Sequence, residues 1–313
     1  MERLTSAAPW PEHLRGGVIA LGNFDGFHRG HQAVVAKARA RAGAAGRPLI
    51  VATFDPHPVR YFHPDAEPFR LTTLDQRARL FRSAGADAML VFEFNAELAS
   101  VPAVDFFTDR IVARTGARAV VTGQDYVFGK GRSGDVALLA ALGRDHGVEV
   151  ETVAAVEDGS GPISSSRIRA ALREGDCETA TLLLTRPFAI EGIVQHGNKI
   201  GRTIGFPTAN LRLERYLRPR YGVYAVRGRL PGGRVLDGVA NLGVRPVIDP
   251  PEELLEPYFF DFTGDLYDQA IEVELIRFIR PEAKLSGLDE LMQWIARDCE
   301  AARAILAATP HLA

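Results

Sequence analysis

The sequence predicts two domains: an α/β domain built on a parallel sheet, followed by an antiparallel β-barrel with a C-terminal helix. Apolar strands alternate with helical segments as far as about residue 185, which is typical of a parallel sheet covered by helices. Beyond that point strand-like runs follow one another across turns rich in Gly, Pro and Asp, which favours an antiparallel barrel. We therefore place one domain at residues 1–185 and the other at residues 186–313.

The strands expected in the first domain are apolar throughout, because both faces of a parallel sheet are buried under helices. Strands are expected at 18–21, 49–54, 88–94, 119–122 and 148–153, and helices at 30–42, 74–84, 101–115 and 134–146. Ligands bind beyond the carboxyl ends of the strands in such sheets. We therefore expect the loops after the first, second and fourth strands to meet at one edge.

The second domain is expected to contain strands at 188–194, 222–230, 235–242, 256–262 and 271–279. Their residues alternate between apolar and polar, as in strands with one buried face. Apolar residues then recur at helical spacing from Leu291 to Leu306, which predicts the closing helix.

Composition narrows the class of protein. The net charge of −2 on 313 residues gives no general attraction to nucleic acid or to an anionic membrane. Two cysteines, Cys177 and Cys299, argue for a reducing compartment and against a disulfide scaffold or structural zinc. We find neither a signal-peptide core nor a run of roughly 18 apolar residues. We expect a cytoplasmic protein.

The loop after the first strand, Gly22 to His31, is the strongest chemical signal in the chain. His28 and His31 are expected where a helix begins, and its unpaired N–H groups favour phosphate. Gly22, Asn23 and Phe24 lead into this turn, where backbone approaches a ligand closely. His-x-Gly-His in this position is typical of nucleotidyltransferases that attack the α-phosphate of ATP. A capping role is the alternative, but two histidines among three glycines favour the functional interpretation.

A second phosphate signal follows the Gly-rich stretch 158–162. Three serines beginning at Ser164 open a helix, and Arg167 and Arg169 follow them. Hydroxyls and N–H groups at a helix start, together with guanidinium groups, suit the β and γ phosphates. The alternative is that Ser164 only caps the helix.

Two further loops carry weaker signals. Asp55 belongs to the rigid loop Thr53–Pro58 after the second strand, and we assign it to the same substrate site as the histidines. Asp125, after the fourth strand, either contacts the second substrate or only forms a turn. The segment 128–134 is expected to be a flexible basic loop, either over phosphate or in solvent.

The second domain opens with its own glycine-rich basic loop. Gly197, Lys199 and Gly201 are suited to wrap a triphosphate, although the Gly-Lys-Ser/Thr of a Walker A loop is absent. Phe206 and Pro207 lead into Thr208 and Asn210, whose side chains face the same way on extended chain. A hydroxyl and an amide oxygen are hard ligands for Mg²⁺. The alternative is an ordinary Thr/Asn turn.

A kinase acting on a hydroxyl needs a carboxylate to accept its proton. Glu256, which we expect to begin an aromatic strand, is one candidate, and Glu252, Glu253 and Asp261 remain open on this reasoning. Arg280 follows the last long strand and either holds a substrate or pairs with an acid.

Eight segments in this order resemble the bacterial bifunctional riboflavin kinase/FAD synthetase family. They are GNFDGFHRGH, TFDPHP, GQDYVFG, ISSSRIR, GRTIGFPTAN, ANLGVRP, FDFTGDLY and IRPEAKL. The resemblance implies a Rossmann-like adenylyltransferase domain that makes FAD and pyrophosphate from FMN and ATP. It also implies a barrel that makes FMN and ADP from riboflavin and ATP, with Mg²⁺ serving both. We expect a monomer or weak homo-oligomer.

By position, the resemblance puts His28, His31, Asp125, Ser164 and Arg169 in the adenylylation site. It puts Thr208 and Asn210 on the kinase metal motif, chooses Glu256 over Glu253 as the base, and puts Phe206 and Arg280 near kinase ligands. Four positions depart from the family pattern: Thr185, Val247, Asp268 and Leu285. Asp268 replaces a turn glycine, where a positive φ is costly.

Three other functions remain open from the sequence. The first is an FMN adenylyltransferase whose barrel only binds flavin. The second is an adenylyltransferase of the pantetheine-phosphate type with an unrelated β domain. The third is a flavin sensor that controls a partner without turnover.

Overall fold

The structure, a computed structural model, describes residues 1–196, 205–245, 252–283 and 287–311. Gly197, Lys199, Gly201, Val247 and Leu285 lie outside the described residues. The chain forms two compact units, one of Met1–Glu67 with Thr72–Ser164 and one of Pro68–Leu71 with Ser165–Ala313. The helices α7 (Ser165–Glu174) and α8 (Cys177–Leu184) thus belong to the second unit. The prediction that the two functional domains meet after residue 185 is not tested by this division and stays a prediction.

The first unit contains a six-stranded parallel sheet, which confirms the predicted α/β fold. Its order is β1-β4-β3-β2-β5-β6, so the central strand β2 lies between β3 and β5. The chain winds in one direction from β2 to β3 and β4 and in the other to β5 and β6, so the switch point lies at β2. The strands are β1 (Glu2–Thr5), β2 (Val18–Leu21), β3 (Leu49–Asp55), β4 (Ala88–Glu93), β5 (Ala119–Gly123) and β6 (Glu149–Val153).

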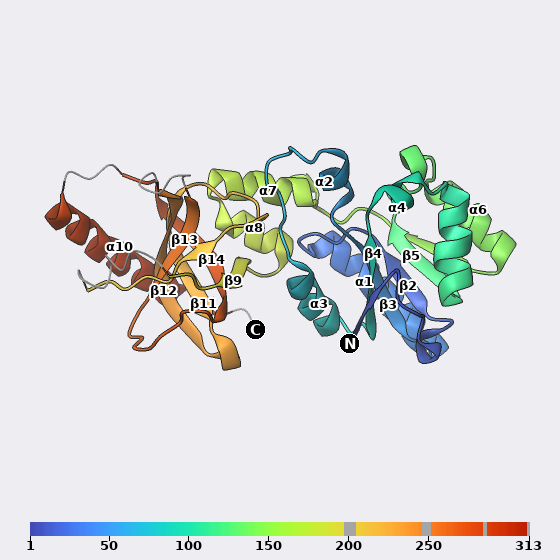
Figure 1. Ribbon diagram of the computed structural model, residues 1–313, viewed down its shortest axis with the longest axis horizontal. Coiled ribbons are helices and arrows are strands. Elements are labelled where there is room, and N and C mark those ends of the chain that lie inside the picture. The colour runs from blue at the N-terminus through green and yellow to red at the C-terminus, as the bar shows by residue number, and fades with distance from the viewer. Residues whose placement is uncertain (197–204, 246–251, 284–286, 312–313) are drawn as a thin grey trace. The chain divides into compact units, whose positions relative to one another are not determined.

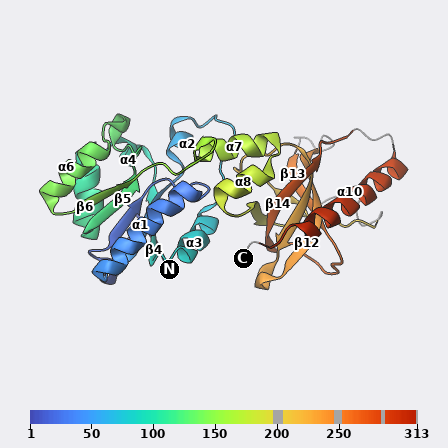
Figure 2. The ribbon, with the colours of Figure 1, turned by 180° about the vertical axis from the view of Figure 1, so that it is seen from behind.

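Helices cover both faces of this sheet. Side chains alternate along a strand, so Val18 and Ala20 of β2 pack with helices α1 (Arg29–Ala45) and α3 (Leu74–Ser83) on one face (Figure 2). Ile19 and Leu21 pack with α6 (Val136–His146) and the helical segment Ala103–Ala113 on the other (Figure 1). Both faces of the parallel sheet are therefore buried, as the unbroken apolar strands predict.

Local details differ from the prediction. The edge strand β1 is mostly exposed and pairs in parallel with β4, so it gives no apolar signal. The expected helix 101–115 is α5 (Ala103–Asp105) followed by a π-helical segment, Phe106–Ala113. Phe128 and Gly134 bond each other's backbone in both directions, so the ends of the loop expected to be flexible are held together. Shorter elements are α2 (Pro58–Phe62), α4 (Ala96–Ser100), β7 (Glu157–Asp158) and β8 (Gly161–Pro162).

The second unit contains the predicted antiparallel six-stranded sheet, in the order β10-β13-β12-β11-β14-β9. A bridge between Gln195 and Asn210 joins its two edges, so the sheet nearly closes into a barrel. The strands are β9 (Phe188–Ile193), β10 (Leu211–Arg212), β11 (Gly222–Arg229), β12 (Val235–Arg245), β13 (Glu252–Phe259) and β14 (Ala270–Arg280). The prediction that Glu256 begins its strand is wrong, because pairing with β12 starts at Glu252.

The predicted C-terminal helix is confirmed as α10 (Leu288–Ala308), which packs on the outside of the barrel (Figure 1). Ala302 and Leu306 are buried against strand residues that include Val223 and Val239. The buried Arg227 of β11 donates hydrogen bonds to the carbonyls of Leu306, Thr309 and Pro310, and so satisfies the end of α10.

Among the described residues, no helix combines the length and the apolar character needed to cross a membrane.

Candidate functional site

The loops that carry the first set of candidate residues leave the same edge of the parallel sheet, as expected. They follow β2, β3 and β5, which are adjacent and parallel. The loop from Gly22 to His28 leaves the central strand, where the winding direction reverses. This is where α/β sheets hold their ligands.

The two histidines form a stacked pair at the start of α1. Their ring centroids lie 3.6 Å apart with planes 21° from parallel. His28 is buried, and its Nδ1 accepts a long hydrogen bond from the His31 backbone N–H at 3.4 Å. In the neutral ring this leaves the proton on Nε2, which is therefore a donor. The edge of the buried Phe24 ring supports His31, with centroids 5.3 Å apart.

Glycines allow this close packing. A Cβ on Gly22 would lie 3.1 Å from the Phe24 ring. A Cβ on Gly30 would lie 3.1 Å from Cε1 of His28 and 3.5 Å from the carbonyl oxygen of Ile163. The absence of a side chain at Gly30 therefore lets the segment that ends in Ser164 run beside the histidine turn.

Buried polar groups behind the histidine loop hold its shape, and no sequence motif indicated them. The Asp25 carboxylate accepts hydrogen bonds from the Thr72 backbone N–H at 3.0 Å and from its hydroxyl at 3.2 Å. The Thr72 hydroxyl in turn accepts one from the Gly26 N–H at 2.9 Å. The neighbouring Thr73 forms a recognisable capping box with Gln76 at the start of α3, but that signal does not extend to Thr72.

The loop after β3 is held through Asp55, whose Oδ1 lies 3.5 Å from Nη2 of the buried Arg77. Asp125 is exposed in the turn after β5, where the Tyr126 N–H bonds the Gly123 carbonyl. Burial raises the pKa of the Tyr126 hydroxyl, whose ring stacks on Phe128. The turn-forming role of Asp125 is thus observed, and contact with a substrate stays a prediction.

Arg167 and Arg169 lie on α7 in the second unit. Arg169 donates from Nε to the Phe69 carbonyl at 2.8 Å, and its guanidinium lies 5.2 Å from the centre of the Phe69 ring. This packing orients the arginine. Phosphate binding by Ser164, Arg167 and Arg169 stays a prediction.

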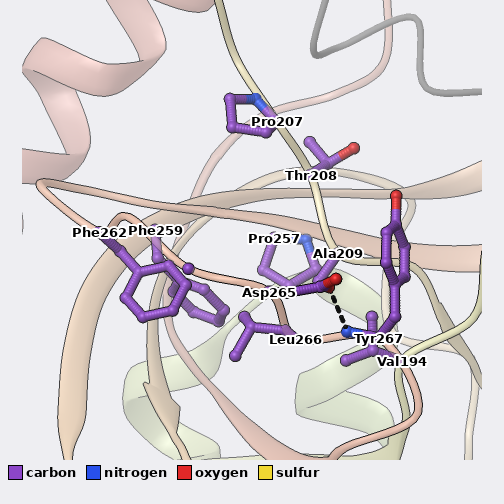
Figure 3. A pocket seen from close by; sticks show the side chains of 11 residues that line it. Val194, Pro207, Thr208, Ala209, Pro257, Phe259, Phe262, Asp265, Leu266 and Tyr267 are labelled. Carbon is purple, nitrogen blue, oxygen red and sulfur yellow. Dashed lines mark hydrogen bonds between the residues drawn. The ribbon is translucent and has the colours of Figure 1, made fainter.

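The barrel contains a small pocket beside the predicted metal motif (Figure 3). Its volume is about 60 Å³, and its lining includes Thr208 and Asp265 among apolar side chains. Asp265 accepts a hydrogen bond from the Tyr267 backbone N–H at 3.0 Å and so closes the turn below the pocket. The apolar part of the lining is Val194, Pro207, Ala209, Pro257, Phe259, Phe262 and Leu266.

Strand register brings the predicted metal ligand Asn210 to the predicted base Glu256. The Ala209 N–H bonds the Pro257 carbonyl at 2.9 Å, and Leu211 pairs with Leu255. Asn210 therefore lies opposite Glu256, where side chains share a face. On the other side β12 places Asn241 opposite Glu256. Glu256 thus stands between two asparagines.

The Asn210 side chain is buried and donates from Nδ2 to the Gln195 carbonyl at 3.4 Å. This bond directs the amide oxygen away from that carbonyl. A buried amide oxygen and the Thr208 hydroxyl at the pocket fit the hard donor set that Mg²⁺ prefers. Across the described part of the chain, no group of three or more His, Cys, Asp or Glu side chains is arranged to hold a metal.

The three competing carboxylates each pair with an arginine. Glu253 accepts from Arg218 Nε at 2.8 Å and from the Tyr221 hydroxyl, and the Arg218 hydrogen bond lowers its pKa. A carboxylate held this way is a weaker base. The other two pairs are Glu252 with Arg212 and Asp261 with Arg303, and the latter hydrogen bonding lowers the Asp261 pKa.

Arg280 pairs with an acid, which was one of the two expected alternatives. It donates from Nε and Nη2 to the buried Asp298 of α10 at 2.9 and 2.7 Å, and lies 4.6 Å from the centre of the Trp294 ring. Phe206 contacts Tyr258 edge to face, with centroids 5.4 Å apart. Roles for Arg280 and Phe206 in ligand binding stay predictions.

Two departures from the family pattern adopt the conformation that favours glycine. Asp268 has φ of 60°, as expected, and its carboxylate lies 3.6 Å from Nε2 of His196. Thr185, at the end of α8, has φ of 65°. Neither residue removes a candidate catalytic group, so the cost of both departures falls on backbone strain.

Comparison with known proteins finds relatives of both halves of the chain. The FAD synthetase family model matches residues 10–167, and the riboflavin kinase family model matches residues 184–306. The chain is 39% identical to the bifunctional riboflavin kinase/FMN adenylyltransferase of Escherichia coli K12 over 90% of each protein. The protein of that name from Pseudomonas fluorescens is 40% identical over 96% of each.

A crystal structure described as a macrolide-efflux protein from Streptococcus pneumoniae has a similar fold. Its TM-score is 0.86 and its identity 31%, over 97% of this chain and 99% of the other. Both halves of the sequence match their family models, and curated relatives align along nearly the whole chain. The chain therefore belongs to the family of bifunctional riboflavin kinase/FMN adenylyltransferases.

Proposed function

We propose that this protein phosphorylates riboflavin with ATP to give FMN and ADP, and then adenylylates FMN with a second ATP to give FAD and pyrophosphate. The observation that carries the proposal is the match of two catalytic family models to two separate halves of one chain. This favours the two-activity enzyme over an adenylyltransferase whose barrel only binds flavin.

Adenylylation needs positioning and charge stabilisation more than covalent chemistry. An FMN phosphate oxygen attacks the α-phosphorus of ATP while the bond to pyrophosphate breaks. His28 and His31 are proposed to donate hydrogen bonds to the phosphate oxygens, and the N–H groups after Gly22 to bind them. Asp55 is proposed to contact ATP or FMN, and Asp125 is proposed to contact the second substrate. On the resemblance alone, Ser164, Arg167 and Arg169 hold the β and γ phosphates.

Riboflavin phosphorylation needs a base for the ribityl 5′-hydroxyl. Glu256 accepts that proton in this proposal, because the family resemblance selects it and it lies opposite the predicted metal ligand Asn210 on the neighbouring strand. Thr208 and Asn210 would hold Mg²⁺, which supplies charge neutralisation of the phosphates when bound. Asn210 and Asn241 share a face of the sheet with Glu256, and the hydroxyl would approach on that face.

Gly197, Lys199 and Gly201 are proposed to wrap the phosphates of ATP, with Phe206, Pro207 and Arg280 near the kinase ligands. Because both reactions consume ATP, the proposal places the enzyme in the cytoplasm. A monomer or weak homo-oligomer stays the expectation.

A time course tests the proposal. Purified protein is incubated with riboflavin, ATP and Mg²⁺, and the flavins are separated by chromatography. FMN is expected first, and FAD afterwards. If supplied FMN becomes FAD while riboflavin stays untouched, the barrel is only a binding module. If both flavins bind and neither changes, the protein is a sensor.

A further inference from the structure

We infer that Arg77 is a positioning residue for FMN adenylylation, acting as a brace between the loops that follow β2 and β3. The inference rests on the proposed adenylylation activity and adds a residue that none of the sequence motifs contains. Arg77 lies on α3 and is 4% exposed, so it acts through other groups and not by touching substrate.

The guanidinium of Arg77 reaches both loops. Its Nη1 donates to the Thr53 hydroxyl at 2.8 Å, to the Asn23 carbonyl at 3.3 Å and to the Phe54 carbonyl at 3.4 Å. Its Nη2 lies 3.5 Å from the carboxylate of Asp55. Only a planar fork of several N–H donors spans such a set of acceptors. Lysine, with a compact ammonium, cannot reproduce it.

The brace fixes the orientation of one peptide group. The Asn23 carbonyl accepts from Arg77 and also from the Thr53 hydroxyl at 2.7 Å. In a trans peptide the following N–H points the opposite way, so the Phe24 N–H is directed away from both donors. No described residue accepts a hydrogen bond from this N–H. The brace therefore presents a backbone donor in the loop proposed to bind phosphate.

Packing alone gives no reason for an arginine here. Taking a guanidinium out of water is costly, and an apolar side chain of similar volume commonly stabilises such a site as well or better. The acceptors of Arg77 instead belong to the segment leading to His28 and to the segment carrying Asp55. A shift of about 1 Å in such a constellation costs about 100-fold in rate.

The test compares Arg77→Met and Arg77→Lys with Arg82→Met, an exposed arginine on the same helix. Conversion of FMN to FAD is measured for kcat and for both KM values, and ATP binding is titrated without flavin. For Arg77→Met we expect kcat to fall about 100-fold, KM to stay within threefold, and two ATP to bind per chain. The kcat of Arg77→Lys should lie between the values of Arg77→Met and the unmodified protein, and the kcat of Arg82→Met should equal that of the unmodified protein.

Thr53→Val gives a second variant at another position. It removes the other donor to the Asn23 carbonyl together with the hydroxyl to which Arg77 donates, and it leaves the Arg77 side chain itself unchanged. Thr53→Val should lower kcat about tenfold. In the double variant with Arg77→Lys, the fold-loss in kcat should be smaller than the product of the fold-losses in the two single variants. Thr53→Val decides the inference if Arg77→Met does not fold.

Three results would overturn the inference. They are an unchanged kcat in Arg77→Met, an unchanged kcat in Thr53→Val, or a fall in ATP stoichiometry from two to one that accounts for the lost rate. The last result would mean that Arg77 only keeps the first unit folded. If the unmodified protein makes no FAD from FMN, the proposed function itself fails.

Discussion

Arg227 is expected to hold the C-terminal helix on the barrel, and its replacement by Met tests this. The side chain is 3% exposed and donates to the carbonyls of Leu306 at 3.0 Å and Pro310 at 3.1 Å, and to that of Thr309. Its Nε lies 3.1 Å from Asp237. A cation also stabilises the negative end of a helix dipole.

The magnitude follows from these contacts. Charge-assisted hydrogen bonds contribute about 1.5–3 kcal/mol each, but water replaces some of them once the helix end is exposed. Breaking a buried charged network costs about 3–5 kcal/mol, and we expect about 3 kcal/mol for Arg227→Met. With a urea slope of about 2 kcal/mol per molar, the midpoint should fall by about 1.5 M.

Trp294 on α10 provides the assay. A Trp10→Phe background makes Trp294 the sole tryptophan, because the chain contains two. The control is Arg229→Met on the same strand, where the side chain is 49% exposed and pairs loosely with Glu274 at 3.8 Å. Exposed pairs contribute about 1 kcal/mol or less. Equal midpoints for the two variants would refute the role given to Arg227.

Three further predictions concern the two sites and pH. His28→Ala should slow FAD formation by about 100-fold to 1,000-fold while FMN formation is unchanged, and equal losses in both assays would contradict the assignment. Glu256→Gln should slow riboflavin phosphorylation by at least about 100-fold and spare adenylylation; Glu252→Gln is its control, and phosphorylation that survives Glu256→Gln would show that another group is the base. The Glu253 pKa is lowered in the folded protein by Arg218, so its contribution to stability is present above its ordinary pKa of 4.5 and lost as pH falls through the lower folded value. The urea midpoints of the unmodified protein and Glu253→Gln should therefore converge below pH 4.5, and a constant gap would contradict that linkage.

The elements predicted with success are those whose signal is local. Strands such as Val18–Leu21 are apolar throughout because both faces are covered, and the start of α1 at Arg29 follows a turn of glycines. The π-helical segment Phe106–Ala113 was missed because its apolar pattern differs little from that of an α-helix. Glu256 was expected to begin a strand because an aromatic run follows it. Pairing of β13 with β12 in fact begins at Glu252, and such pairing is not visible in the sequence of one strand.

The choice among four carboxylates shows what chain folding adds. Glu252, Glu253 and Asp261 meet arginines that lie 40, 35 and 42 positions away in the sequence. From the residues alone, each of these three acids is as good a candidate for the base as Glu256. For Glu253 and Asp261 the hydrogen-bonded arginine lowers the pKa of the carboxyl group, which weakens it as a proton acceptor.

The sequence by itself determined the two fold classes, the edge of the parallel sheet where the histidines lie, and the family. These follow from periodicity and from residues that are close together along the chain. Only the tertiary structure decided that Arg280 pairs with Asp298, that Asn210 and Asn241 flank Glu256, and that Arg77 braces the loop of Asn23. Such contacts join residues far apart in sequence, and the strand register and helix packing that create them exist only once the chain has folded.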